Sequence, residues 1–430
     1  MSEESKYEYK IHPFDLSCIH DRKPKISVIF KDEFQNFGGV ALRLYLDDEM
    51  VKCEKLEKRN IVYFPEKNLE YGEHRVKLVI KNCKKKNFHI KWTFYVDDKD
   101  KEYNFYYGNP HSHTGYSDGK ETPTEAFEYA RDKELDFLMI SDHVGKLLKN
   151  NTSYDNSISL HGCKYPKWAM TKLEADRINS KYDDFVAIVG FELSTVFWGH
   201  MNFFDCNELV NKKKFMIEDM SQWINTHQDL LLVVNHPFKT VGTLKCESPF
   251  NKCILLYEYG NGSPPRPYIR SEDLYYKVLD DGWTFGAING QDNHQATWGD
   301  ADNLTGVIAE NLTKKDIVEA MRMRRVFSTE SRTLRLLFKL DEYFMGSIIN
   351  VRVGESLNVE VHIEDLVVNI EKVQLISNGG VVINEHIIES TGVFEWNTNI
   401  TVTEDNTWYL VKAIMNDDKI GISSPIFLRK

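Results

Sequence analysis

Histidine and carboxylate side chains with the spacing of metal ligands recur through the middle third of the sequence. His111 and His113 are two residues apart, so on a strand both imidazoles project to the same face and can reach one ion. Asp292 and His294 repeat this spacing. Mixed histidine and carboxylate sets suit Mn, Fe or Zn, and such ions catalyse hydrolysis. The candidate ligands are His111, His113, Asp118, His143, Glu192, His200, His236, Asp292 and His294.

Several of these candidates close short apolar runs, where strands are expected to end. His143, Glu192 and His236 each do so, and Pro237 stops the last strand where a site needs an open loop. Asp142 should point away from His143, which suits an acceptor that orients a ligand. Each motif alone is weak evidence, but six of the fourteen histidines and three acids recur in this way. Because the ends of parallel strands converge on one mouth of a barrel, we expect a single metal site.

The segment that carries these residues, 105–331, alternates expected helices with short apolar runs, which is typical of an α/β fold. One helix start is legible, because Thr122 can serve as the N-cap, Pro123 as the first helical residue and Glu125 as the capping-box partner. Residues 145–165 are polar and aperiodic and follow a strand end, so they are a candidate lid. The apolar runs suit parallel strands buried on both faces and lie at residues 137–140, 185–189, 230–234, 254–257 and 284–288.

The two flanking segments show the period-two alternation of half-buried strands. Residues 1–104 alternate apolar and polar side chains in short runs separated by turn residues, and they predict an N-terminal β-sandwich. The same pattern returns in residues 332–430 and predicts a C-terminal β-sandwich. The sequence therefore predicts three domains, with the hydrolase-like segment of residues 105–331 in the middle.

Composition excludes some classes of partner. The 430 residues carry a formal net charge of −11, whereas nucleic-acid binding needs a broad basic surface. The seven cysteines are scattered without a CxxC pair, as expected for reduced thiols in the cytosol. No signal peptide is legible and no apolar run approaches membrane-spanning length. We therefore expect a cytoplasmic protein that binds neither nucleic acid nor a membrane.

The order of the candidate residues resembles the PHP domain, the polymerase and histidinol phosphatase superfamily, and within it the CehA/McbA-type metallohydrolases. The resemblance covers residues 105–331 and implies a distorted seven-stranded (β/α) barrel with a trinuclear metal site. The motifs that carry it are His111-x-His113, Asp118, Asp142-His143, Glu192, His200, Asn235-His236-Pro237 and Asp292-x-His294.

The resemblance also implies how the ligands are shared among the ions. One ion would take His111, His113, Glu192 and Asp292. A second would share Glu192 and add His200 and His236, and a third would take Asp118, His143 and His294. Some family members have histidine where this chain has Asp118, which leaves the occupancy of the third site open.

Two or three divalent ions held close together would generate a hydroxide from bound water and neutralise charge on a phosphate or carbonyl oxygen. If the third ion is absent, His143 or His294 is a candidate proton donor to the leaving group. Lys146, Lys239 and Arg332 are candidate contacts to an anionic small-molecule substrate.

The first functional hypothesis is a phosphoesterase that acts on a phosphomonoester, a phosphodiester or a cyclic phosphate. Hydrolysis of a carbamate, ester or amide by the same site is an alternative, and a non-catalytic binding scaffold is another. The flanking sandwiches suit packing, substrate-binding walls or the contacts of a homo-oligomer equally well, so they do not discriminate among these hypotheses.

Overall fold

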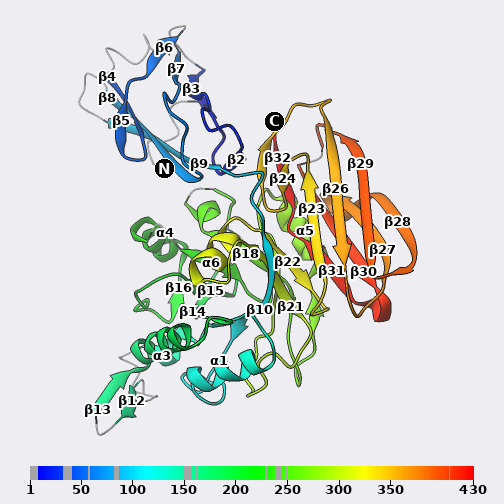
Figure 1. Ribbon diagram of the computed structural model, residues 1–430. Coiled ribbons are helices and arrows are strands. Elements are labelled where there is room, and N and C mark those ends of the chain that lie inside the picture. The colour runs from blue at the N-terminus through cyan, green and yellow to red at the C-terminus, as the bar shows by residue number, and fades with distance from the viewer. Residues whose placement is uncertain are drawn as a thin grey trace. The chain divides into compact units, whose positions relative to one another are not determined.

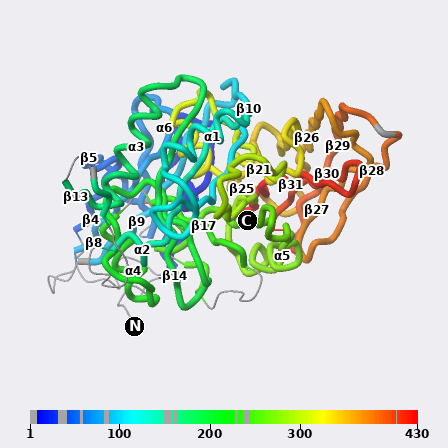
Figure 2. Tube along the Cα trace, turned by 90° about the horizontal axis from the view of Figure 1, so that it is seen from below, coloured from blue at the N-terminus to red at the C-terminus, as the bar shows by residue number. Residues whose placement is uncertain are grey.

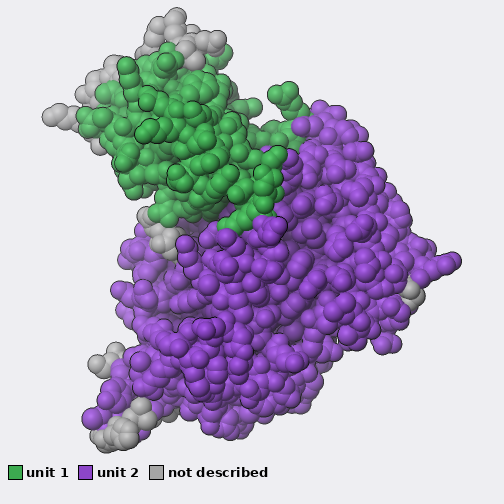
Figure 3. Space-filling view, viewed as in Figure 1, with its two compact units in different colours: residues 1–101, 347–352, 428–430 green, residues 102–346, 353–427 purple. Residues whose placement is uncertain are grey.

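The computed structural model describes residues 8–31, 41–56, 59–81, 87–148, 157–160, 163–227, 230–237, 244–247, 249–405 and 407–430. The chain divides into two compact units (Figure 3). Unit 1 comprises Met1–Lys101, Ser347–Arg352 and Leu428–Lys430, and unit 2 comprises Glu102–Gly346 and Val353–Phe427. The finer division into three domains, with boundaries after residues 104 and 331, stays a prediction.

Unit 1 consists of two sheets around one apolar core. One sheet has the strand order β1-β3-β7-β6 and the other has the order β2-β9-β8-β4-β5. Val76 and Leu78 of one long strand and Trp92 and Phe94 of the next alternate with exposed residues and point into the core. The strands are β1 Tyr9–His12, β2 Ser17–Ile19, β3 Ile26–Phe30, β4 Ala41–Leu46, β5 Glu49–Val51, β6 Glu54–Leu56, β7 Asn60–Tyr63, β8 Gly72–Lys81, β9 Asn87–Val96 and β25 Ile348–Asn350.

Unit 2 begins with a mixed sheet that carries the candidate ligands. β10, β11 and β14 are parallel to one another, and so are β17, β18 and β20. β15 lies antiparallel between β14 and β17, and β21 is antiparallel to β10. The strands are β10 Asn104–Ser112, β11 Phe137–Ile140, β14 Val186–Thr195, β15 His200–Phe204, β16 Lys214–Phe215, β17 Leu231–Val234, β18 Ile254–Asn261, β19 Ile269–Arg270, β20 Gly286–Gly290, β21 Leu304–Ala309 and β22 Val326–Thr329.

The five apolar runs predicted as strands all fall on strands of this sheet. β11 and β17 are buried along their whole length, as expected where both faces of a sheet are covered. The described strands include the antiparallel β15 and β21, so the structure is a β-rich mixed sheet with few helices. The closed seven-stranded (β/α) barrel stays a prediction.

The helices of unit 2 are short and amphipathic. Thr122 caps α1 by accepting a hydrogen bond from the backbone of Glu125, whose side chain accepts one from the Thr122 backbone, so the predicted capping box is confirmed. Phe127 is among the residues that this helix buries. The helices are α1 Pro123–Asp132, α2 Val144–Leu147, α3 Lys167–Lys181, α4 Ile217–Thr226, α5 Glu272–Asp280 and α6 Lys314–Arg322.

The last third of unit 2 forms further β-structure in two sheets. β27, β28, β30, β31 and β32 continue the mixed sheet, whereas a separate four-stranded sheet has the order β24-β23-β26-β29. β22 pairs with β31, and Ser424 Oγ donates a hydrogen bond of 2.7 Å to Val326 O. Within this unit, β27 and β30 lie at the end remote from α3 and α4 (Figure 2). The strands are β23 Arg335–Leu340, β24 Tyr343–Phe344, β26 Ser356–Glu364, β27 Ile370–Ser377, β28 Val381–Thr391, β29 Val393–Thr401, β30 Trp408–Met415, β31 Ile420–Ser423 and β32 Ile426–Arg429.

The segment predicted as a lid contains three short elements. α2 starts directly after His143, and β12 Ser157–Leu160 pairs with β13 Cys163–Pro166 in a hairpin that extends from unit 2 (Figure 1). Residues 149–156 and 161–162 lie outside the described part, so the lid role stays a prediction. No helix in the described residues combines the length and the apolarity that crossing a membrane requires.

Candidate metal centre

The ends of successive strands in unit 2 bring the predicted ligands to one place. His111 lies near the end of β10, and the backbone N–H of His113 donates to Asn293 O at 2.9 Å, which ties that strand end to the loop after β20. Glu192 lies on β14, and its backbone forms an isolated parallel β-bridge with His143, which follows β11. Each of the nine predicted ligands belongs to at least one of four groups that share members. Within each group, one ligand atom from every residue lies within 4.8 Å of the others.

Glu192 is the common member of two of these groups. Its carboxylate is 1% exposed. Among the described residues its Oε2 atom has no hydrogen-bonding partner of good geometry. Five imidazole nitrogens surround the carboxylate at 2.8 Å (His143 Nδ1), 3.2 Å (His200 Nδ1), 3.2 Å (His236 Nε2), 3.4 Å (His111 Nε2) and 3.7 Å (His113 Nε2). Ligands that share a cation approach one another at such distances, so this arrangement fits a bridging carboxylate.

A second cluster of contacts joins His111, His113 and Asp292. The two Nε2 atoms face each other at 3.2 Å, and Asp292 Oδ1 lies 3.4 Å from the first and 3.2 Å from the second. One ring nitrogen can donate to the other when only one of them is protonated, and two unprotonated nitrogens in this position can share an ion. Asp292 has a φ of 47° and His236 a φ of 30°, and such left-handed backbone in non-glycine residues gathers at functional sites.

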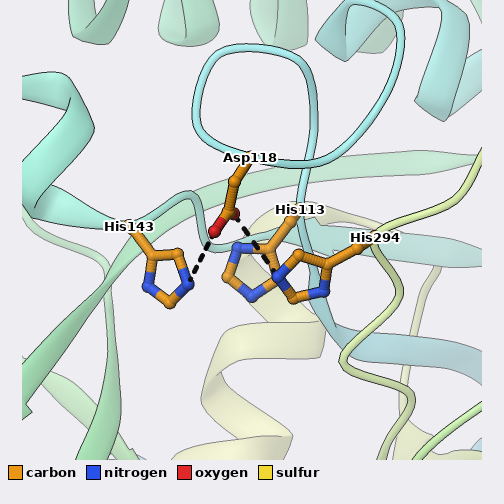
Figure 4. Close-up of side chains that lie close together, drawn as sticks. All are labelled: His113, Asp118, His143 and His294. Atoms are coloured by element: carbon orange, nitrogen blue, oxygen red, sulfur yellow. Dashed lines mark ion pairs between the residues drawn. The ribbon is translucent and has the colours of Figure 1, made fainter. Parts of the chain in front are cut away.

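The third cluster contains Asp118, His143, His294 and His113 (Figure 4). The Asp118 carboxylate lies between two imidazoles, 3.6 Å from His143 Nε2 and 3.4 Å from His294 Nε2. The ring of His113 stacks on that of His294, with 4.1 Å between centroids. The structure thus brings Asp118, His143 and His294 together and adds His113 to the group.

The charges in the cluster shift the pKa values of its members in opposite directions. Burial acts to lower the pKa of His111, but the negative charges of Glu258, Asp292 and Glu192 outweigh it and hold that pKa well above its usual value. Burial lowers the pKa of His113 to about 4. Burial acts to raise the pKa of Glu192, yet its histidine neighbours hold it well below the usual range. A neutral His113 beside ionised carboxylates has the protonation that metal ligands need.

Asp142, predicted to orient a ligand, is fully buried and contacts the loop that carries Asp118. Its carboxylate accepts hydrogen bonds from Thr114 N at 2.8 Å and Thr114 Oγ1 at 2.7 Å, and another from Ser117 Oγ. Burial raises the pKa of Asp142. It is therefore placed to position Asp118 through the backbone, and none of these three hydrogen bonds comes from an imidazole.

Glu258 was not foreseen from the sequence, although it lies at the centre of the contacts beneath the cluster. Its Oε1 atom lies 2.6 Å from His111 Nδ1, and its Oε2 atom accepts from His236 N at 2.5 Å and from Asn261 Nδ2 at 2.8 Å. A side chain at Gly290 would collide with this carboxylate, so the glycine makes room for it. A carboxylate held on the far nitrogen of a ligating histidine fixes the tautomer that leaves Nε2 for the ion.

The clusters open into a pocket of about 420 Å³. Arg266, also unforeseen, lines this pocket; its guanidinium is half exposed and pairs with Asp292 Oδ2 at 2.5 Å. The remaining lining residues are Asp118, His143, Glu192, His200, His236, Asn261, Gly262, Pro267, Ile269, Asp292 and His294.

The three cations predicted to contact substrate are placed differently. Lys146 lies on α2 and Arg332 lies at the start of the last third of unit 2, and neither lines the pocket. The Arg332 guanidinium pairs with Asp302 at 2.9 Å and also donates to backbone carbonyls of Lys133, Gly299 and Ala301. Lys239 lies outside the described residues. Arg266 therefore lines the pocket, whereas Lys146 and Arg332 do not.

Comparisons with known proteins return structural likenesses only. No protein-family model matches the sequence, and no curated protein matches it. One similar structure is a two-domain protein of Bacteroides vulgatus that contains a predicted PHP-like metal-dependent phosphoesterase; the match has 15% identity and a TM-score of 0.44, and it covers 76% of this chain and 95% of that one. Another is a candidate metal-dependent phosphoesterase of Bifidobacterium adolescentis, with 14% identity, a TM-score of 0.30 and coverage of 50% and 94%. Likenesses at these scores establish neither the family nor the activity of this chain.

Proposed function

We propose that this protein is a metal-dependent hydrolase of small anionic esters, and specifically a phosphoesterase. The observation that carries the proposal is the buried Glu192 carboxylate with five imidazole nitrogens within 3.7 Å, at the base of a pocket walled by Arg266. Two buried carboxylates, Glu192 and Asp292, repel each other, and carboxylate oxygens and imidazole nitrogens gathered around them are a donor set that fits divalent cations.

The finer assignment follows the family resemblance. We propose a PHP-type barrel of the CehA/McbA branch that binds two or three Mn, Fe or Zn ions, with the ligands divided as the resemblance implies. Two features of the four ligand groups in unit 2 support the proposal: Glu192 belongs to two groups, as a bridging ligand would, and Asp118, His143 and His294 lie in one group. That group also contains His113, and His200 and His236 fall in separate groups. When bound, such ions polarise a phosphate oxygen and activate water for attack.

The residues of the chain prepare the pocket for that reaction. Glu258 holds the Nδ1 side of His111, so that Nε2 stays directed at Glu192 and Asp292. His143 and His294 line the pocket, and if the third ion is absent they are candidate proton donors to a leaving group. Arg266 has a planar fork of donors that can bind a pair of phosphate oxygens at the pocket wall.

The decisive test compares the wild type with Glu192→Ala in metal content and in hydrolysis of bis-nitrophenyl phosphate and nitrophenyl phosphate after Mn supplementation. We expect two or three ions per wild-type chain, fewer in the variant, and a loss of activity of about 1000-fold or more. Glu272→Gln is the matched control, because Glu272 pairs with Lys412 in the same unit and does not line the pocket.

The same assay separates the alternatives. Inorganic phosphate should inhibit a phosphoesterase. Hydrolysis of naphthyl esters that phosphate does not suppress would favour a carbonyl-ester, carbamate or amide hydrolase with the same site. A wild type without bound metal, together with no effect of Glu192→Ala, would leave the binding scaffold as the better explanation.

A further inference from the structure

Unit 1 contains a group of metal-ligand side chains that is separate from the nine candidate ligands of unit 2. Cys18, His20 and Asp97 each offer one ligand atom, and these three atoms lie within 4.8 Å of one another. We propose that these side chains form a second metal site, which binds Zn²⁺ or another borderline-soft divalent ion. This site takes no part in the proposed hydrolysis, so either proposal can be correct if the other is wrong.

The pairing of two strands brings these residues together. β2 runs parallel to β9, with Cys18 opposite Tyr95 and Ile19 opposite Val96. Directly opposed residues share a face of the sheet, and residues two apart on a strand share a face as well. Cys18, His20 and Asp97 therefore project from the same face, whereas Phe94 and Val96 project from the other and belong to the core of unit 1.

Backbone hydrogen bonds fix the ends of this short strand. Asp97 N donates to Ile19 O at 2.8 Å, and Leu16 N donates to Thr93 O at 2.6 Å. The two bonds flank Cys18 and hold β2 against β9, so the ligand atoms are brought together by the backbone before any ion binds. Preorganisation of this kind reduces the conformational entropy that metal binding would otherwise have to offset.

The chemistry of the donors indicates which ion fits. Zn²⁺ binds thiolate sulfur at about 2.3 Å and imidazole nitrogen or carboxylate oxygen at about 2.0–2.2 Å. Atoms within 4.8 Å of one another lie close to twice these bond lengths, so small side-chain rotations let all three reach one ion. Three protein ligands leave the fourth tetrahedral position for water or an exogenous ligand.

The thiolate also distinguishes this site from the centre in unit 2. In the described residues, no ligand group of unit 2 includes a cysteine. Thiolates select Zn²⁺ and softer ions, whereas Mn²⁺ prefers oxygen and nitrogen ligands. Mn²⁺ should therefore load the centre in unit 2 and leave Cys18 without metal, while Co²⁺ used as a substitute for Zn²⁺ should bind both.

Cobalt substitution tests the proposal in the full-length chain. The protein is stripped with a chelator and reloaded with Co²⁺, and its near-ultraviolet spectrum is recorded, because thiolate-to-Co²⁺ charge transfer absorbs there and imidazole or carboxylate ligation does not. We expect a charge-transfer band in the wild type. Cys18→Ser should lose it and bind one Co²⁺ fewer per chain. Cys53→Ser should keep both, since Cys53 belongs to unit 1 but to none of the ligand groups in the described residues.

Two further variants keep the test decisive if Cys18→Ser does not fold, as judged by circular dichroism. His20→Gln and Asp97→Asn retain the thiol. Each should weaken Co²⁺ binding by about 10-fold or more, with the charge-transfer band as the measure of binding. Glu192→Ala should retain the band, which separates failure of this site from failure of the hydrolase centre. A wild type without the band, or a band that persists in folded Cys18→Ser, would overturn the proposal.

Discussion

Two buried histidines, His74 in unit 1 and His113 in unit 2, show two ways of placing an imidazole inside a protein. His74 is 6% exposed, and both of its nitrogens have partners: Nδ1 lies 2.7 Å from Asp47 Oδ2 and Nε2 lies 2.8 Å from Glu70 O. His113 is 0% exposed, and its Nδ1 atom has no hydrogen-bonding partner among the described residues. Its Nε2 atom faces Asp292 and another histidine.

The difference shows that the protein supplies partners for both ring nitrogens of His74, whereas one ring nitrogen of His113 has none among the described residues. An unpaired buried polar atom costs about 1–3 kcal/mol, so the surroundings of His113 are unfavourable unless something else satisfies them. The carboxylates of Glu192 and Asp292 add mutual repulsion that raises this cost. A cation bound beside Nε2 would remove the repulsion between the two carboxylates. His74, with its partners supplied by the protein, needs none.

The largest expected effect comes from removing the metal. Chelation should lower the melting temperature of the protein, because an ion present at about 1000 times its dissociation constant stabilises the folded state by about 4 kcal/mol. Differential scanning calorimetry with Mn²⁺ and with a chelator measures the difference. His74→Gln should show the same difference, since its network binds no ion. Equal melting temperatures in Mn²⁺ and in chelator would remove the distinction between the two histidines.

The next effect tests the carboxylate beneath the cluster. Glu258→Gln should weaken metal binding by about 10- to 100-fold. The amide holds His111 Nδ1 less strongly, and it lacks the negative charge that offsets the positive charge of the ion. Isothermal titration with Mn²⁺ measures the affinity, and Glu272→Gln is the control for loss of a glutamate charge elsewhere in unit 2. Unchanged affinity in Glu258→Gln would mean that the orientation of His111 does not depend on this contact.

A smaller effect is expected at the pocket wall. Arg266→Ala should raise KM for an anionic phosphate ester by about 10-fold, the loss of one charge-assisted hydrogen bond, with little change for a neutral ester. Steady-state kinetics on the two substrates measure this split. An equal rise for both would assign Arg266 to holding Asp292, with which it pairs, and not to recognising charge.

Residue type and spacing were sufficient to select side chains that the fold brings together, because strand ends impose a readable order on the chain. His111 and His113 could be paired from their spacing, and the capping box at Thr122 fixed the start of α1. The sequence does not reveal strand direction in this way, because the same apolar run can form a strand that is parallel or antiparallel to its neighbours. The antiparallel placement of β15 therefore had no signal in the sequence.

The residues that were missed lack the periodic context that revealed the others. Glu258 lies inside β18, where a charge interrupts an apolar run, and its contacts with His111, His236 and Asn261 explain why burial is tolerated there. Arg266 lies between Pro265 and Pro267 in a loop without regular spacing, so only the folded chain brings it to the pocket. A buried acid in an apolar strand is nevertheless a signal that could have been used.

The smallest expected effect is the pH dependence of the stability that His74 contributes. Burial acts to lower the pKa of His74, but its hydrogen bonds and the charge of Asp47 outweigh it, so the pKa in the folded state lies above 6.5. The ion pair therefore stabilises the fold fully below pH 6.5, and the gain is lost as the pH rises through the raised folded-state pKa.

This contribution should be at most about 1 kcal/mol, because the Asp47 partner is half exposed to solvent. Melting temperatures of the wild type and His74→Gln, measured in excess Mn²⁺ from pH 5 to pH 8, should converge as the pH rises. Excess Mn²⁺ keeps the titration of the centre in unit 2 the same in both proteins. A difference that stays constant across this range would show that His74 contributes through packing on Phe94, with which its ring stacks, and not through its charge.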